Sequence, residues 1–257
     1  MMMKHGDYTR LAGSYSRSRP DYCESVLDAL LSLLPSPAAE IDGVDVGAGT
    51  GIWTRMLAAR GMRSLTAIEP NDAMREQGVL DSAEFAIEWR KGFGADTGLP
   101  SKSYDLITTA SSFHWIDFEE GAREFARLLR PGGRFAALWN PRLIEANPLL
   151  VEIKEYLQSL KPAMKRVSSG RSGLCETLID RLGDTPYFDD TVYLEGRHVI
   201  EMTPERYIGA WKSVNDVQVQ LGGNLFREFL EYIEKRIDGM VFIKSTYLTR
   251  AWAARRR

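Results

Sequence analysis

The sequence of 257 residues is poor in the side chains that build disulfide frameworks and zinc sites, with two cysteines and three histidines. Cys23 and Cys175 lie far apart in the chain, and neither has a second cysteine or a histidine at metal-ligand spacing. We therefore expect free thiols, no bound metal and a reducing, cytoplasmic environment.

Long apolar runs and an excess of one charge are also absent. No stretch approaches the roughly 18 uninterrupted apolar residues of a membrane-spanning helix, and Met1–Asp7 lacks the apolar core of a signal peptide. The net charge of -2 gives no broad attraction to nucleic acid, and Arg255–Arg257 is typical of a solubilising tail. These features predict a monomer or homodimer that acts on a small molecule, without nucleic-acid or membrane partners.

The sequence does contain a regular alternation of apolar strands and amphipathic helices. Up to residue 140 the pattern predicts strands at 41–46, 64–68, 85–89, 104–110 and 134–139, with helices at 22–34, 52–60, 72–78 and 118–129. This alternation is typical of a doubly wound, mostly parallel sheet that is covered by helices on both faces. We therefore predict an α/β fold.

The pattern changes beyond Asn140. Helices are predicted at 148–160, 204–212 and 225–237, a polar and mobile segment at 161–173, a strand at 191–199, and a last strand at 245–251 at the sheet edge. Because no internal repeat or low-complexity linker separates the halves, we expect a single domain. Within it, we expect an N-terminal arm and helix (1–36), a ligand-binding core (37–140), and helical additions with the last strands (141–257).

The most informative motif is a strand that runs directly into a glycine-rich loop, Val44-Asp45-Val46-Gly47-Ala48-Gly49-Thr50-Gly51. Apolar residues at helical spacing follow it, so the loop forms a strand-to-helix turn. Glycines at such a turn let a ligand approach the backbone, and the first N–H groups of the helix attract electron-rich groups. The motif predicts a site for a nucleotide-like ligand.

Other distinctive side chains follow the remaining predicted strands. In open parallel sheets, ligands bind in the crevice outside the carboxyl ends of the strands, so these groups are expected to share one cleft. They are Glu69, Pro70, Asn71 and Met74 after the second strand, Gly94-Ala95-Asp96 after the third, Ser111-Ser112-Phe113-His114-Trp115 after the fourth, and Asn140 after the fifth.

Glu69 carries the strongest single inference, because a carboxylate at the end of the second strand can accept both hydroxyl hydrogens of a ribose. Met74 could lie along an adenine face or simply belong to the core. Asp96 could bind the adenine amino group or serve as an ordinary turn residue. The residue three positions beyond Gly49 is Ile52, where a dinucleotide-binding loop has its third glycine, and no lysine-containing triphosphate loop is present. A nucleoside without a pyrophosphate is favoured.

Together, these motifs resemble the class I S-adenosylmethionine-dependent methyltransferases, and most closely a small-molecule branch that includes trans-aconitate methyltransferase-like proteins. The resemblance is strong over Tyr8–Asn140 and weaker at Trp211-Lys212-Ser213 and Thr246–Arg250. Besides the glycine loop, it rests on Ala67-Ile68-Glu69-Pro70, Thr97-Gly98-Leu99-Pro100, Tyr104-Asp105-Leu106-Ile107, Ser112-Phe113-His114-Trp115 and Leu129-Arg130-Pro131-Gly132-Gly133.

The resemblance implies a Rossmann-like, seven-stranded sheet with an antiparallel last strand. It also implies S-adenosylmethionine as cofactor, with its methionine part near Gly47–Gly51 and its ribose on Glu69. Tyr15 or Arg19 would meet the methionine carboxylate from an N-terminal segment that folds over the cofactor, or would only pack that segment. Relatives carry the acid of the third loop at the position of Ala95, whereas here it is Asp96. Backbone at Gly94 and Ala95 could therefore contact the adenine.

Methyl transfer from a sulfonium is an in-line displacement, so a protein has mainly to align the reactants and exclude water. His114 could accept a proton from an oxygen or nitrogen acceptor, with a carbon acceptor less favoured, or could merely wall a pocket. Candidates for the acceptor pocket are Trp115, Trp139, Arg142 and Trp211, each of which could equally be packing. Two alternatives remain open, a nicotinamide-dependent oxidoreductase and a methyltransferase-like binding protein without turnover.

Overall fold

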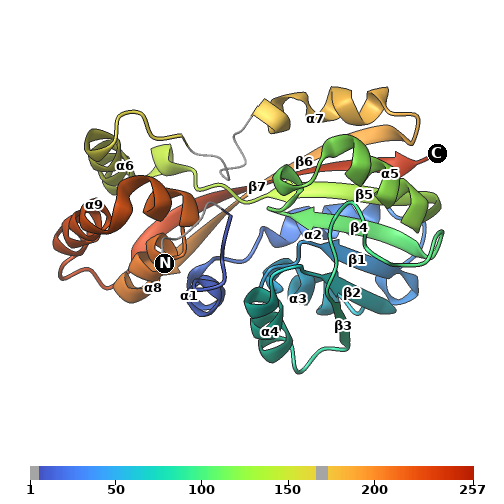
Figure 1. The fold of residues 1–257 in the computed structure, drawn as a ribbon, viewed down its shortest axis with the longest axis horizontal. Coiled ribbons are helices and arrows are strands. Elements are labelled where there is room, and N and C mark those ends of the chain that lie inside the picture. Colours follow the sequence, from blue (N-terminus) through green and yellow to red (C-terminus); the bar gives the residue numbers. More distant parts are fainter. Residues whose placement is uncertain (1–5, 166–172) are drawn as a thin grey trace.

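The computed structural model describes residues 6–165 and 173–257, so part of the segment predicted to be mobile lies outside the described residues. Seven strands form one sheet in the order β3-β2-β1-β4-β5-β7-β6 (Figure 1). β7 runs antiparallel to both of its neighbours, and the pairs among β1 to β5 are parallel. The strands are β1 (Asp42–Val46), β2 (Ser64–Ile68), β3 (Ile87–Arg90), β4 (Tyr104–Ala110), β5 (Leu129–Trp139), β6 (Phe188–Met202) and β7 (Ile243–Arg256).

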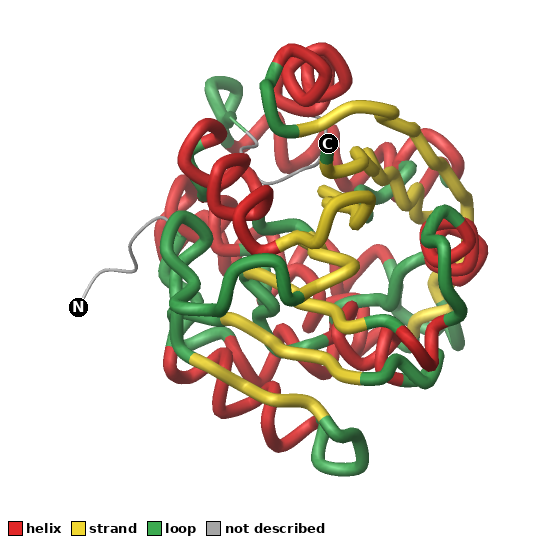
Figure 2. The backbone as a smooth tube through the Cα atoms, turned by 90° about the vertical axis from the view of Figure 1, so that its right-hand side faces the viewer, coloured by secondary structure: helices red, strands yellow, loops and turns green. Residues whose placement is uncertain are grey.

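Helices cover both faces of the sheet, which confirms the doubly wound α/β prediction (Figure 2). One face packs against α5 (Phe118–Leu128) and α7 (Gly173–Asp184), with Phe125 and Phe135 at ring-centroid separation 4.8 Å. The opposite face packs against α2 (Glu24–Ser32) and α3 (Ile52–Ala58). The helix α4 (Asp72–Asp81) lies beside β3, where Gly78 leaves room for the Trp89 ring.

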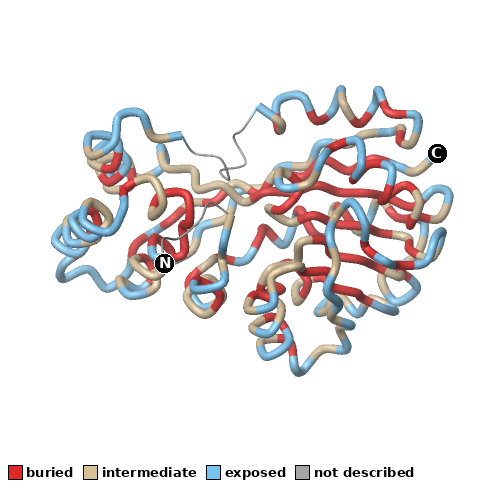
Figure 3. The backbone as a smooth tube through the Cα atoms, viewed as in Figure 1, coloured by how far each residue is buried: buried red, intermediate tan, exposed pale blue. Residues whose placement is uncertain are grey.

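A third apolar cluster lies at one end of the long antiparallel pair β6 and β7, which two helices connect (Figures 1 and 3). It contains buried side chains of α6 (Pro148–Leu160), α8 (Pro204–Lys212) and α9 (Asn215–Arg236), together with Met202, Ile243 and Tyr247 of these strands. The short helix α1 (Ala12–Ser18) contacts both α8 and α4. The N-terminal segment therefore crosses from this helical cluster to the ligand-binding part of the sheet.

Several predicted elements have different bounds or positions in the structure. The last strand, predicted at the sheet edge, is internal: β7 lies between β5 and β6, and β6 is the edge. The run Ala251–Ala254 is buried throughout, as expected of a strand covered on both faces. Helices α1 and α7 were not predicted, and α9 begins ten residues before the predicted 225–237 helix, with a kink at Gly222 (φ 71°).

A buried carboxylate joins three elements beneath the glycine loop. Asp45 of β1 is completely buried and accepts hydrogen bonds from Thr54 Oγ1 of α3 (2.6 Å) and Thr108 Oγ1 of β4 (2.9 Å). Burial raises the pKa of Asp45 from 3.8 to about 6, against the opposing effect of the two hydroxyl donors. The structure therefore gives Asp45 a scaffolding position.

Because the folded-state pKa of Asp45 is raised, its ionised form lowers stability, and stability is lost as pH rises from 3.8 towards 6. We expect Asp45→Asn to abolish this dependence. The free energy of unfolding of the wild type should fall relative to the variant by about 3 kcal/mol across that interval. Urea unfolding of both proteins at several pH values measures the difference, and parallel pH profiles would contradict the assignment.

Candidate active site

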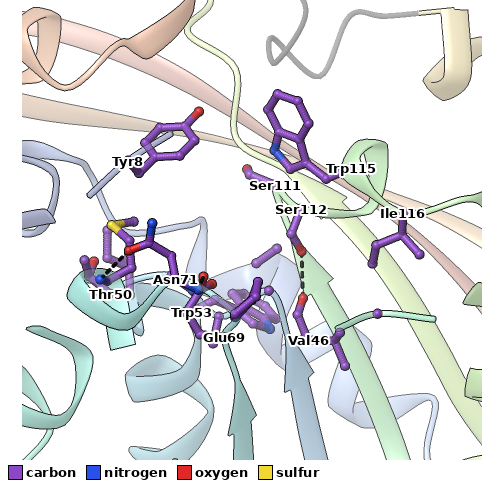
Figure 4. A pocket seen from close by; sticks show the side chains of 18 of the residues that line it. Tyr8, Val46, Thr50, Trp53, Glu69, Asn71, Ser111, Ser112, Trp115 and Ile116 are labelled. Carbon is purple, nitrogen blue, oxygen red and sulfur yellow. Dashed lines mark hydrogen bonds between the residues drawn. The ribbon is translucent and has the colours of Figure 1, made fainter. Parts of the chain in front are cut away.

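The carboxyl ends of β1, β2 and β4 border a cavity of about 630 Å³. Figure 4 shows Glu69, Asn71 and Val46 on its strand side, with Tyr8 and Trp115 across from them. Most of the side chains predicted to share a cleft do so. The predicted cofactor residues that line this cavity are Tyr15, Arg19, Gly47, Ala48, Gly49, Glu69, Pro70, Asn71, Met74, Gly94, Ala95 and Ser111.

The glycine loop needs its glycines for both conformation and space. Gly47 and Gly51 have φ values of 69° and 78°, in the left-handed region that disfavours other residues. A Cβ on Gly47 would lie 2.5 Å from Cβ of Ser112, and one on Gly51 would lie 2.8 Å from the Trp89 ring. Gly47 lines the cavity, whereas Gly51 does not and is the N-cap residue immediately before α3.

Glu69 links the glycine loop to the loop after β2. Its Oε2 accepts the Gly49 N–H and its Oε1 accepts the Asn71 N–H, both at 2.8 Å. The side chain is 7 % exposed and lines the cavity, and burial raises its pKa above the ordinary value of 4.5. Each carboxylate oxygen can accept more than one hydrogen bond, so both keep capacity for a ligand.

The loops after β2 and β3 supply the next part of the wall. Asn71 caps α4 by accepting the Met74 N–H at 3.1 Å, and the Met74 side chain is both buried and at the cavity wall. Gly94 and Ala95 also line the cavity. Asp96 does not, although its backbone pairs with that of Phe93, which does. The prediction that the Asp96 carboxylate faces the ligand is therefore not supported.

A second cavity of about 300 Å³ adjoins the first. The two cavities share six lining residues, Tyr8, Tyr15, Arg19, Ser111, Asn140 and Tyr247, which we call the neck. Ser111 has a φ of 57°, a strained conformation for a serine that is typical of functional sites. Its N–H donates to the Leu138 carbonyl (2.7 Å), and its hydroxyl lies 2.9 Å from that of Tyr22.

The structure separates the aromatic residues that follow β4. Trp115 lines the first cavity and is 46 % exposed. His114, in the 3-10 turn Phe113–Trp115, lines neither cavity, and its Nδ1 accepts a hydrogen bond from Trp139 Nε1 at 3.3 Å. This position does not place the His114 ring beside an acceptor in either cavity, so the structure gives the general-base hypothesis no support.

The other three predicted acceptor residues, Trp139, Arg142 and Trp211, line the second cavity. Sequence reasoning missed several wall residues. Tyr22, Phe93 and Ile116 line the first cavity, and Lys154, Leu157 and Met164 line the second. No sequence motif marks these six residues, and only the three-dimensional structure places them at the walls. Tyr8 also lines both cavities, and it lies in the N-terminal segment that was expected to fold over the cofactor. In the described part of the chain, no cluster of three or more His, Cys, Asp or Glu side chains could hold a metal.

Described helices include none that is both long and apolar enough to cross a membrane. Both cysteines are buried free thiols.

Comparisons with known proteins find similarity to methyltransferases. Residues 44–137 match a family model described as a methyltransferase domain. An uncharacterized methyltransferase of Mycobacterium tuberculosis is 37% identical over 130 residues, which are 51% of this chain and 50% of that protein. Nocamycin O-methyltransferase of Saccharothrix syringae is 32% identical over 133 residues, 49% of this chain and 47% of that protein. The chain spans about half the length of these curated relatives.

Similarity of the whole fold extends further than similarity of sequence. A solved structure from Anaeromyxobacter dehalogenans, provisionally named a type II methyltransferase, has a TM-score of 0.68 at 21% identity and covers 92% of this chain and 97% of its own. At that identity the likeness concerns the fold alone. The matched residues, which include the glycine loop and Glu69, are thus similar to methyltransferase domains, and the fold of the chain is similar to that of a solved methyltransferase structure.

Proposed function

We propose that this protein transfers a methyl group from S-adenosylmethionine to an oxygen or nitrogen atom of a small-molecule acceptor. The observation that carries the proposal is the Glu69 carboxylate, which is buried at the end of β2, held by two backbone N–H groups and exposed to the larger cavity. A carboxylate so placed fits the two hydroxyl groups of a ribose.

The remaining walls fit the other parts of the cofactor. The loop Gly47–Gly49 would hold the methionine part, and Met74 with the backbone at Gly94 and Ala95 would border the adenine. Arg19 would meet the methionine carboxylate, since it lies at the neck and is fixed by donation to Ser213 Oγ (2.7 Å). S-adenosylmethionine supplies an electrophilic methyl group on a sulfonium, so the protein need not activate a leaving group.

The protein then has to align the acceptor and exclude water. The neck connects the two cavities, so an acceptor in the smaller cavity would reach the donor through it. Tyr8 and Tyr15 of the N-terminal segment lie at this junction, in edge-to-face contact at 5.9 Å between ring centroids, and would shield the reacting atoms. We therefore propose residues 1–36 as a cover, 37–140 as the cofactor-binding core and 141–257 as the contributor of the acceptor pocket.

Proton removal needs no dedicated base when the acceptor is already ionised or exchanges its proton with water. The hydroxyl of Tyr22, near Ser111, is not a suitable base, because burial raises its pKa far above the ordinary value. An oxygen acceptor has independent support in one relative, which is named as an O-methyltransferase.

The nicotinamide alternative is weaker. The residue at the position of the third dinucleotide-loop glycine is Ile52, whose side chain is 8 % exposed and packs in the apolar cluster beneath α3. We also propose a cytoplasmic location, supported by the two free thiols.

Substitution of Glu69 tests the cofactor site. We expect Glu69→Ala to weaken S-adenosylhomocysteine binding by about 100-fold. The variant loses the two charge-assisted hydrogen bonds proposed with the ribose hydroxyl groups, and the Gly49 and Asn71 N–H groups lose their acceptor. Isothermal calorimetry on the wild type and the variant measures the change.

The matched control is Glu76→Gln, an exposed carboxylate on α4 that does not line the cavity, which should bind like the wild type. Absence of S-adenosylhomocysteine binding by the wild type, or equal affinity in Glu69→Ala, would overturn the proposal. Tight binding of NADH by the wild type would instead favour the oxidoreductase alternative.

The raised pKa of Glu69 predicts a pH dependence of cofactor binding. Ribose hydroxyls donate best to the ionised carboxylate, so S-adenosylhomocysteine affinity should fall as pH drops through the pKa of Glu69, above 4.5. We expect a flat profile over the same interval in Glu69→Gln. Asp45 also titrates near there, so the profile is repeated in Asp45→Asn, where the dependence should persist. If the pH dependence disappears in Asp45→Asn but persists in Glu69→Gln, it arises from Asp45, and the prediction for Glu69 is wrong.

A further inference from the structure

The smaller cavity contains positive charge and no acidic side chain among the described residues that line it. Arg19, Arg142 and Lys154 contribute the positive groups, and Ile144, Leu157, Met164 and Val214 contribute apolar surface. This combination differs from the larger cavity, whose wall includes Glu69, Asp117 and Glu120. The charge pattern favours an acceptor with a negative group and an apolar body.

The three cations are not equivalent. Lys154 lies 3.8 Å from the Glu145 carboxylate, and both side chains are more than half exposed to water. Arg19 donates to the hydroxyl and the carbonyl of Ser213 and is already assigned to the cofactor's carboxylate. Arg142 lines only the smaller cavity and has no part in the proposed cofactor site, so it is the cation best placed to recognise an acceptor.

Arg142 is surrounded by aromatic rings. Its guanidinium carbon lies 4.6 Å from the ring centroid of Trp211, 5.5 Å from that of Tyr207 and 5.9 Å from that of Tyr247. Its backbone pairs with Tyr247 of β7 in an isolated antiparallel bridge. The guanidinium is thus held in a fixed position, which reduces the entropy lost when it binds a ligand.

Two buried polar groups beside Arg142 make no hydrogen bond of regular geometry. They are the Nε1 of Trp211 and the hydroxyl of Tyr207, which lie near each other and near the guanidinium. Trp211 is 4 % exposed and lines the cavity, and its indole N–H can only donate. Buried donors without acceptors are costly, so a guanidinium and an indole N–H at one wall favour a ligand that brings acceptor oxygens.

We propose that the smaller cavity binds an acceptor bearing a carboxylate, which pairs with Arg142 while a separate nucleophilic atom lies at the neck. A planar carboxylate matches the two parallel donors of a guanidinium, and its single negative charge matches the single positive charge of Arg142. Arg142 lines only the smaller cavity, so the group it holds is a recognition group and not the atom that receives the methyl group. The inference rests on the proposed function, because it takes the larger cavity to be the donor site.

Binding of matched acids and amides tests the proposal directly. Calorimetry on protein saturated with S-adenosylhomocysteine would compare phenylacetate and hexanoate with phenylacetamide and hexanamide, which have similar shape and no charge. Phenyl phosphate and benzenesulfonate test other anions. We expect at least about tenfold tighter binding of each acid than of its amide, and weaker binding of the phosphate and sulfonate.

Substitutions assign the preference to Arg142. In Arg142→Gln, the affinity for phenylacetate should fall at least about tenfold, to the level of the amide, and Arg142→Lys should restore part of it. Lys154→Gln, the matched control on the same wall, should keep the preference. Thermal melting checks the fold of each variant, and Arg142→Lys still decides the matter if Arg142→Gln does not fold.

Three results would overturn the inference: no detectable binding of any acid, equal affinity for acids and amides, or an unchanged acid preference in both Arg142 variants. Tighter binding of phenyl phosphate than of phenylacetate would show that the cavity selects a phosphate group, which also contradicts the proposed carboxylate. The affinity of the same proteins for S-adenosylhomocysteine distinguishes failure of the proposed function from failure of the carboxylate inference. If the wild type does not bind it, the proposed function fails; if it binds but the acid preference is missing, only this inference fails.

Discussion

The carboxylate of Glu69 is the contact on which the organisation of the proposed donor site depends. By accepting one N–H from Gly49 and one from Asn71, it ties the loop after β1 to the loop after β2. Both loops present backbone to the cavity, so their relative position decides whether a nucleoside fits. Burial of a carboxylate is unfavourable unless its oxygens accept hydrogen bonds. Here the two backbone N–H groups offset part of this free-energy cost, and the hydroxyl groups of a bound ribose would offset more of it.

A second buried acid supports the first from below. Asp45 joins β1, β4 and α3 through two threonine hydroxyls, directly beneath the glycine loop that Glu69 holds from the side. The loop is therefore fixed by neighbours in the sheet and in the following helix, and its left-handed glycines are compatible with that fixed path. The raised pKa values of the two acids have the same origin, because both carboxylates are withdrawn from water in one small region.

Most of the wall of the larger cavity, the proposed donor site, could be predicted from the sequence because its determinants are local. A glycine pattern after an apolar strand and an acid at the next strand end define positions on a parallel sheet without knowledge of the remaining chain. Asp96 and His114 show the limit of this reasoning. Each follows a strand as expected, but neither lines the larger cavity, and the His114 ring instead accepts a hydrogen bond from Trp139.

The acceptor half could not be predicted in the same way, because it is assembled by contacts distant in sequence. Arg142 follows β5, its aromatic neighbours come from α8 and β7, and Tyr8 and Tyr15 reach the neck from the N-terminal segment. That assembly requires β7 to lie inside the sheet, where Tyr247 can pair with Arg142, and not at the edge. In the proposed function, the acceptor pocket would therefore depend on β7 and α8, whereas the glycine loop and Glu69 would hold the donor.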